Sequence, residues 1–227
     1  MLPAVTGKIG NNQYGTVPKS STTQALISMV HAWSKHTDGN DATVRVVLFD
    51  FRKTLNLIDH GILAKKLENL DLPSGIVYWV IDFLKNRKQR VKLIQDCFSE
   101  WGVVPAGVPQ GTKLGPWLFL VMINDINADK LDPRKFVDDT TMAEAVPSDG
   151  NSKIQESVND LVDQTLATKF QLNQTKCKEL RITFSKSDPT LEHFFRSKME
   201  HSHHRNYEEM CPEVLLCHAV ETSTSGY

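Results

Sequence analysis

The sequence is poor in cysteine and lacks a long apolar run. Its 227 residues include only four scattered cysteines, Cys97, Cys177, Cys211 and Cys217. So few cysteines exclude a disulfide scaffold and favour a reducing compartment. The longest apolar run, Trp117–Ile123, is far shorter than the ~20 residues of a membrane span. We therefore expect an intracellular protein, in the nucleus or the cytoplasm, with no membrane partner.

An excess of one charge and an excess of turn-forming residues are lacking too. Lys and Arg number 26 and Asp and Glu 27, a balance that argues against a chain basic throughout. The 12 glycines and 10 prolines exclude collagen and wholesale disorder. Four histidines and two cysteines near the C-terminus lack zinc-finger spacing, so we expect no zinc site at His201, His203, His204, Cys211, Cys217 and His218.

The sequence does contain segments with apolar residues at helical spacing, and short runs of β-branched residues lie between them. Helices are expected to begin at Ser20 or Ser21, after Asp59, at Pro73–Ser74, at Gly115 and at Ser152. Strands are expected at Val44–Phe49, as a pair within Val91–Val104, as two arms within Phe136–Met142, and at Leu180–Phe184. This order is not a regular βαβ alternation and indicates an α+β fold, followed by a poorly structured tail over 186–227.

Three aspartates are candidates for a metal site. Asp50 ends a buried strand, and Asp138 and Asp139 form an expected hairpin turn. The two elements would bring the carboxylates together if they are neighbours in one sheet, and such hard oxygen ligands suit Mg²⁺. The alternative is an ordinary solvated turn, because Asp favours turns anyway.

Two further segments suggest contact with phosphate. Gly107–Pro116 places Gln110 between glycine turns just before an apolar helix, where backbone approaches a ligand closely; the alternative is a tight loop with a helix cap. A basic run without acids follows a predicted helix and would track a phosphate backbone; the alternative is a solvated face. Its members are Lys85, Arg87, Lys88, Arg90 and Lys92.

Taken in order, these motifs resemble the reverse transcriptase domain of non-LTR (LINE-type) retrotransposons. The resemblance rests on VVLFDF at a strand end, AGVPQGTKLGPWLF before a helix and KFVDDTT at a hairpin. It extends to NNQYGTVPKSSTTQALISMVHAW, to FLKNRKQRVKL and to KFQLNQTKCKELRITF, and covers residues 2–188. It implies a right-hand polymerase palm with a partial fingers region and no thumb. The implied domains are a fingers approach segment over 1–43, the palm over 44–185, and a divergent tail over 186–227.

The resemblance implies a role for each matching residue. Asp50 and Asp138 would bind two Mg²⁺ ions, with Mn²⁺ as a substitute, and Asp139 would support them. Lys176 would assist near the pyrophosphate. Template and incoming nucleotide would contact Leu55, Pro109, Gln110, Gly111 and Phe136.

The implied reaction is attack of a DNA primer 3′-hydroxyl on the α-phosphorus of a deoxynucleoside triphosphate, directed by an RNA template. One departure from the family concerns sugar selection, because Leu55 stands where the family has an aromatic that discriminates against the ribose 2′-hydroxyl. The alternative function is a catalytically inactive nucleic-acid-binding remnant of a retrotransposon.

Overall fold

The structure, a computed structural model, describes residues 2–38, 42–94, 97–127, 131, 133–147, 150–183 and 214–218. In these stretches no helix is long and apolar enough to cross a membrane. The chain forms two compact units, each built from three segments. The helical unit contains Met1–Asn11, Arg52–Asp125 and Leu166–Gln171, and the sheet unit contains Asn12–Phe51, Ile126–Thr165 and Leu172–Tyr227.

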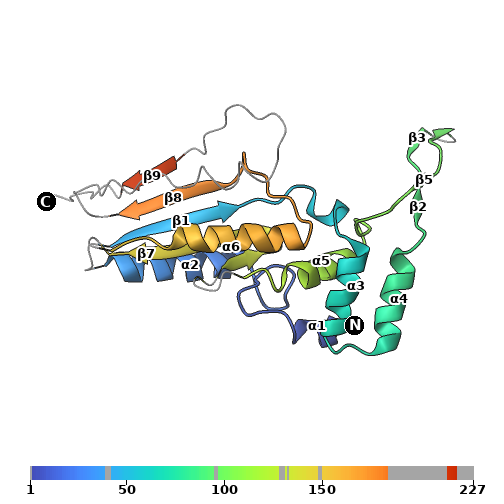
Figure 1. Cartoon of the computed structure of the whole chain (residues 1–227), viewed down its shortest axis with the longest axis horizontal. Helices are drawn as coiled ribbons and strands as arrows, with labels where there is room; N and C mark the ends of the chain where they lie inside the picture. Colours follow the sequence, from blue (N-terminus) through green and yellow to red (C-terminus); the bar gives the residue numbers. More distant parts are fainter. Residues whose placement is uncertain are drawn as a thin grey trace, which may run out of the picture. The chain divides into compact units, whose positions relative to one another are not determined.

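The sheet unit is built on five strands in the order β6-β7-β1-β8-β9 (Figure 1). The strands are β6 (Arg134–Phe136), β7 (Asp139–Val146), β1 (Thr43–Phe49), β8 (Lys178–Thr183) and β9 (Val214–His218). The central strand β1 runs antiparallel to both β7 and β8, and β9 runs parallel to β8. Six of the seven β1 residues are buried, which explains its run of β-branched and apolar side chains.

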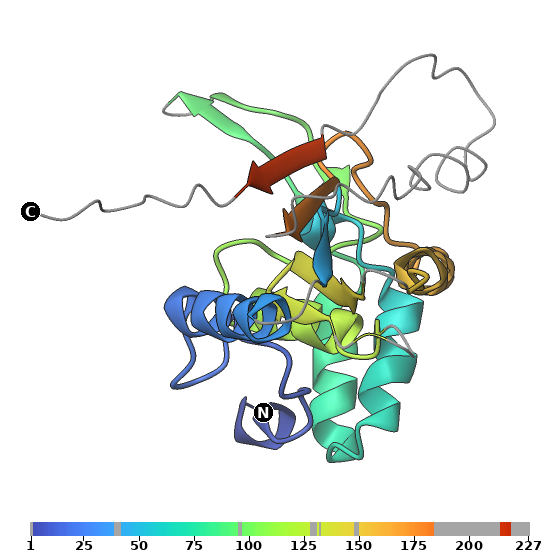
Figure 2. The same ribbon diagram turned by 90° about the vertical axis from the view of Figure 1, so that its left-hand side faces the viewer.

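Two helices accompany the sheet. Helix α2 (Thr22–Thr37) begins after Ser21, whose side chain accepts a hydrogen bond from the Gln24 backbone N–H, and it packs against the sheet (Figure 2). Helix α6 (Ile154–Ala167) begins where the carboxylate of Glu144 in β7 accepts hydrogen bonds from the backbone N–H groups of Lys153 and Ile154. A carboxylate at this end satisfies unpaired donors and complements the helix dipole.

The helical unit surrounds one fully apolar helix. Eight of the ten residues of α5 (Leu114–Ile123) are buried, so the helix is apolar on all sides. It packs against α3 (His60–Asn69), α1 (Leu2–Thr6) and the short turn η1 (Thr54–Asn56), and α3 also packs against α4 (Ser74–Leu84) (Figure 1). Asp59 caps α3, and Pro73 precedes α4, as the sequence predicts.

The α+β class is confirmed, with three differences in detail. The strand pair expected at Val91–Val104 begins earlier and is two short ladders, β2 (Lys88–Gln89) with β5 (Gly102–Val103) and β3 (Lys92–Ile94) with β4 (Cys97–Phe98). The hairpin turn is one residue earlier than expected, as described below. The expected tail over 186–227 lies outside the described residues except for β9, a strand that apolar periodicity did not single out.

Candidate active site

Three carboxylates lie at one end of the sheet. The β1–β7 ladder ends where Phe49 pairs with Thr140, so Asp50, the residue after β1, and Asp139, the first residue of β7, both lie next to this last pair. Asp138 belongs to the tight turn between β6 and β7. Our prediction of an Asp-Asp turn was therefore wrong by one residue, because Asp139 pairs with Phe136 and the two turn residues are Val137 and Asp138.

The electrostatics of this cluster reflect its crowding. Partial burial of the carboxyl group, and after it the negative charges of Asp138 and Asp50, raise the pKa of Asp139. A cation relieves part of this repulsion, since the Lys176 Nζ lies 3.8 Å from Asp50 Oδ2. The Lys176 segment is held there by the backbone, where the Asn173 N–H donates to the Asp50 carbonyl oxygen at 2.8 Å. The cluster thus combines three carboxylates with one ammonium group.

The donor chemistry of the cluster fits a hard divalent cation. Carboxylate oxygens are what Mg²⁺ and Mn²⁺ prefer, and mutual repulsion among unbalanced carboxylates is what such an ion relieves. Within the described stretches, however, no three His, Cys, Asp or Glu side chains converge closely enough to enclose a metal ion. Ligands of this kind leave most coordination positions to water and substrate phosphates.

The turn that carries Asp138 has a strained backbone. Val137 has φ +59°, a conformation that is rare for a β-branched residue. Gln13 binds it on both sides: its Oε1 accepts from the Val137 N–H at 3.0 Å, and its Nε2 donates to the Val137 carbonyl at 3.4 Å. Gly15 lies so close that a Cβ there would be 2.4 Å from the Val137 nitrogen. Strain held in place by neighbours is typical of functional sites.

Gln13 was not among the sequence-predicted site residues. Its side chain is almost fully buried, and the same Oε1 also accepts from the Gly15 N–H at 2.8 Å. The NNQYG segment was noted only as part of the resemblance, and periodicity gives an isolated glutamine no role. Its function follows from the segment pairing beside β6, where Gln13 bridges to Lys135.

The helical unit brings the expected nucleotide-contacting residues together. The Val108 N–H donates to the Leu55 carbonyl at 2.8 Å, and Gln110 Nε2 donates to Asn56 Oδ1 at 3.1 Å. Gly107 has φ +83°, and a Cβ there would meet the Asn56 carbonyl oxygen at 2.7 Å. The glycine therefore permits close packing of the loop on η1. Leu55, Pro109, Gln110 and Gly111 all belong to the helical unit, whereas Phe136 belongs to the sheet unit, where it pairs with Asp139.

The basic run continues from the end of α4 into residues 88–94 and 97–103, which carry the two short ladders β2–β5 and β3–β4 and are called the ribbon below (Figure 1). Lys85 is the C-cap residue of α4, and Lys88 and Lys92 lie on the ribbon strands. Lys85, Lys88, Arg90 and Lys92 are exposed, and Arg87 is half-buried. This exposure suits contact with phosphate.

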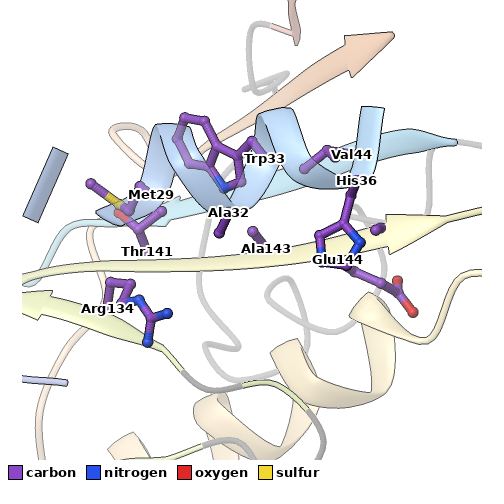
Figure 3. A pocket seen from close by; sticks show the side chains of 10 residues that line it. Met29, Ala32, Trp33, His36, Val44, Arg134, Thr141, Ala143 and Glu144 are labelled. Carbon is purple, nitrogen blue, oxygen red and sulfur yellow. The ribbon is translucent and has the colours of Figure 1, made fainter. Parts of the chain in front are cut away.

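A small pocket lies between α2 and the sheet. Figure 3 shows Met29 of α2 near Thr141 of β7, and His36 of α2 near Glu144 of β7. Its volume is about 120 Å³. Pockets for small-molecule ligands are usually about 300–1,000 Å³, so this pocket is too small for a nucleotide.

Comparison with known proteins places the fold. The chain superposes on an apo telomerase from Candida tropicalis truncated from its C-terminal domain, with TM-score 0.57 and 12% identity over 78% of this chain and 37% of the other. A second C. tropicalis telomerase, in complex with a fragment of telomeric RNA, superposes with TM-score 0.60 and 10% identity over 79% of this chain and 32% of the other. The corresponding C. albicans complex superposes with TM-score 0.58 and 13% identity over 82% of this chain and 34% of the other. Such low identities show the fold alone.

The chain spans about a third of the length of these telomerases. No curated protein matches its sequence. A family model described as reverse transcriptase (RNA-dependent DNA polymerase) matches residues 1–207, which include all the motifs described above. The chain therefore belongs to the reverse transcriptase family.

Proposed function

We propose that the chain is part of an RNA-directed DNA polymerase that extends a DNA primer with deoxynucleoside triphosphates on an RNA template. We propose further that it derives from a non-LTR (LINE-type) retrotransposon and acts inside the cell, in the nucleus or the cytoplasm. The observation that carries the activity is the juxtaposition of Asp50 and Asp139 at one end of the β1–β7 ladder, beside the strained turn of Asp138.

In this proposal Asp50 and Asp138 hold two Mg²⁺ ions, and Asp139 supports them. Bound at such carboxylates, two ions activate an attacking hydroxyl and stabilise the leaving oxygen. Lys176 carries positive charge next to Asp50, where it assists departure of the pyrophosphate. Leu55 and Gln110 contact the incoming nucleotide and the template, supported by the hydrogen bond between Gln110 and Asn56. Leu55 also selects against ribose less strictly than an aromatic side chain would.

Primer extension tests this function. With Mg²⁺, an RNA template and labelled deoxynucleotides, the wild-type chain should extend a primer, and Asp138→Asn should reduce extension at least about a hundredfold, because it removes a charge that balances the metal. Asp82→Asn is the matched control, since Asp82 is an exposed aspartate of the helical unit. Equal activity of wild type and Asp138→Asn would contradict the proposal.

A second candidate is a nucleic-acid-binding remnant without catalysis. It is favoured by the exposed basic run, Lys85, Arg87, Lys88, Arg90 and Lys92, because nucleic-acid binding by these side chains needs no catalytic site. A chain that is folded by circular dichroism, binds RNA and extends no primer would assign the protein to this function.

A further inference from the structure

The ribbon that follows α4 exposes aromatic side chains as well as basic ones. Trp101 is 59% exposed and Phe98 is 39% exposed. Large aromatic side chains on an exposed two-stranded ribbon cost solvation free energy unless a ligand covers them. The proposed polymerase function assigns no role to either ring.

Arg90 connects the two rings. Its guanidinium carbon lies 3.9 Å from the centre of the Phe98 ring and 4.7 Å from the centre of the Trp101 ring. Lys92 Nζ is 5.6 Å from the Phe98 ring centre. A cation on the face of an aromatic ring restrains the position of the ring. Because Trp101 is largely exposed, a second planar group can still reach its ring.

The charge around the rings fits a polyanion. Residues 85–104 contain five basic and two acidic side chains, and one of the acids, Asp96, lies outside the described residues. Among the described residues of the ribbon, Glu100 is the acidic side chain beside Trp101. Alternating cations and exposed aromatic rings is how proteins bind single-stranded nucleic acid, because phosphates contact the cations and bases stack on the rings.

We propose that the ribbon is a binding site for single-stranded nucleic acid in which Trp101 and Phe98 stack on unpaired bases and Arg90 and Lys92 bind the adjacent phosphates. This inference deepens the proposed function, on which the choice of nucleic acid as ligand rests. The nucleic acid bound by the ribbon must be unpaired, because a base inside a duplex has no free face on which an aromatic ring could stack. Base stacking, and not charge alone, therefore contributes to affinity.

Two oligonucleotides separate stacking from charge. Fluorescence anisotropy should measure binding of a labelled oligouridine and of an abasic oligomer with the same number of phosphates. We expect the wild-type chain to bind the oligouridine about tenfold more tightly, within the range for one stacked base. Trp101→Ala should remove most of this preference, leaving the part that stacking on Phe98 contributes, without changing the salt dependence. Trp101→Phe should keep most of the preference. Charge reversal at Lys92, which the proposal places on a phosphate, should instead reduce the salt dependence.

Trp79→Ala is the matched control, because Trp79 in α4 is 58% exposed but stacks on Phe83. Equal affinities for the two oligomers, or equal losses in Trp101→Ala and Trp79→Ala, would overturn the inference. Concentration-dependent dimerisation that Trp101→Ala abolishes would assign the rings to a second copy of the chain and overturn it too. Binding is measured without nucleotides, so a chain that binds but does not extend contradicts only the polymerase function.

Discussion

At Val137 one side chain binds the turn that precedes Asp138 on both sides: Gln13 accepts from the Val137 N–H and donates to the Val137 carbonyl. Asp50 and Asp138 could be predicted from the sequence, because carboxylates are the ligands that the expected metal site requires. Gln13 has no such chemical signature: its role depends on a strained turn 124 positions away in the chain. The sequence also gave no reason to expect φ +59° at Val137, because a valine is among the residues least suited to it.

Gln13→Leu tests whether this glutamine positions the turn. The substitution leaves the partly buried Val137 N–H without its acceptor, which costs about 1 kcal/mol of unfolding free energy. We expect primer extension to fall about tenfold and the Val137 amide to exchange hydrogen faster. Gln13→Glu keeps the acceptor oxygens and should retain more activity, and the exposed Gln24→Leu should change neither measurement. If the Val137 amide exchanged hydrogen at the same rate in Gln13→Leu as in the wild type, the turn would keep its conformation without Gln13.

At the scale of elements, capping residues predicted the first residues of the helices more accurately than turn-forming residues predicted the position of the β6–β7 turn. Ser21 and Asp59 precede their helices because their side chains satisfy the first backbone N–H groups, an interaction between neighbours in sequence. The turn of β6 and β7 was predicted one residue late because Asp138 and Asp139 are both good turn formers. Which of them turns is decided by pairing with Phe136, a tertiary property.

The start of α3 allows a test of the cap and its ion pair separately. Asp59 accepts from the N–H groups of Gly61 and Ile62, and Lys169 Nζ lies 2.6 Å from its Oδ2. A hydrogen bond from Lys169, followed by the one from the Ile62 N–H, lowers the pKa of Asp59. Asp59→Ala should lower the unfolding free energy by about 1 kcal/mol, measured by urea denaturation.

Asp59→Asn separates the two contributions, because asparagine caps a helix about as well but carries no charge. We expect it to lose less stability than Asp59→Ala, since the partly exposed ion pair with Lys169 is worth little. Equal losses in the two variants would mean that the ion pair, and not the cap, stabilises this end of α3.

At the scale of the whole molecule, the fold class followed from the order of elements, but the interior of the sheet did not. A central strand that reads as apolar contains the fully buried Arg45, whose Nε donates to Glu179 Oε1 at 2.8 Å. Arg181 donates to the same oxygen at 3.1 Å. Strand periodicity predicts that an arginine lies at the surface. The pairing of β1 with β8 is needed to see that Glu179 balances the charges of Arg45 and Arg181.

The buried cluster makes stability depend on pH. Burial alone would raise the pKa of Glu179, but hydrogen bonds and charges from Arg45 and then Arg181 outweigh burial and lower it. A lowered pKa in the folded state means that the stabilisation is present above the unfolded pKa of about 4.3 and is lost as pH falls through the folded value. We therefore expect urea denaturation to show less stability at acidic pH than at pH 7.

Glu179→Gln should remove this pH dependence along with much of the stability. It leaves two buried guanidinium groups without their carboxylate, which costs about 3–5 kcal/mol at pH 7 when one partner of a buried pair is removed. The wild type and the variant should converge as the pH falls, because protonated Glu179 resembles glutamine. Glu68→Gln, at an exposed position of α3, should follow the wild type throughout. Parallel pH curves for the wild type and Glu179→Gln would mean that the acid sensitivity does not arise from this buried cluster.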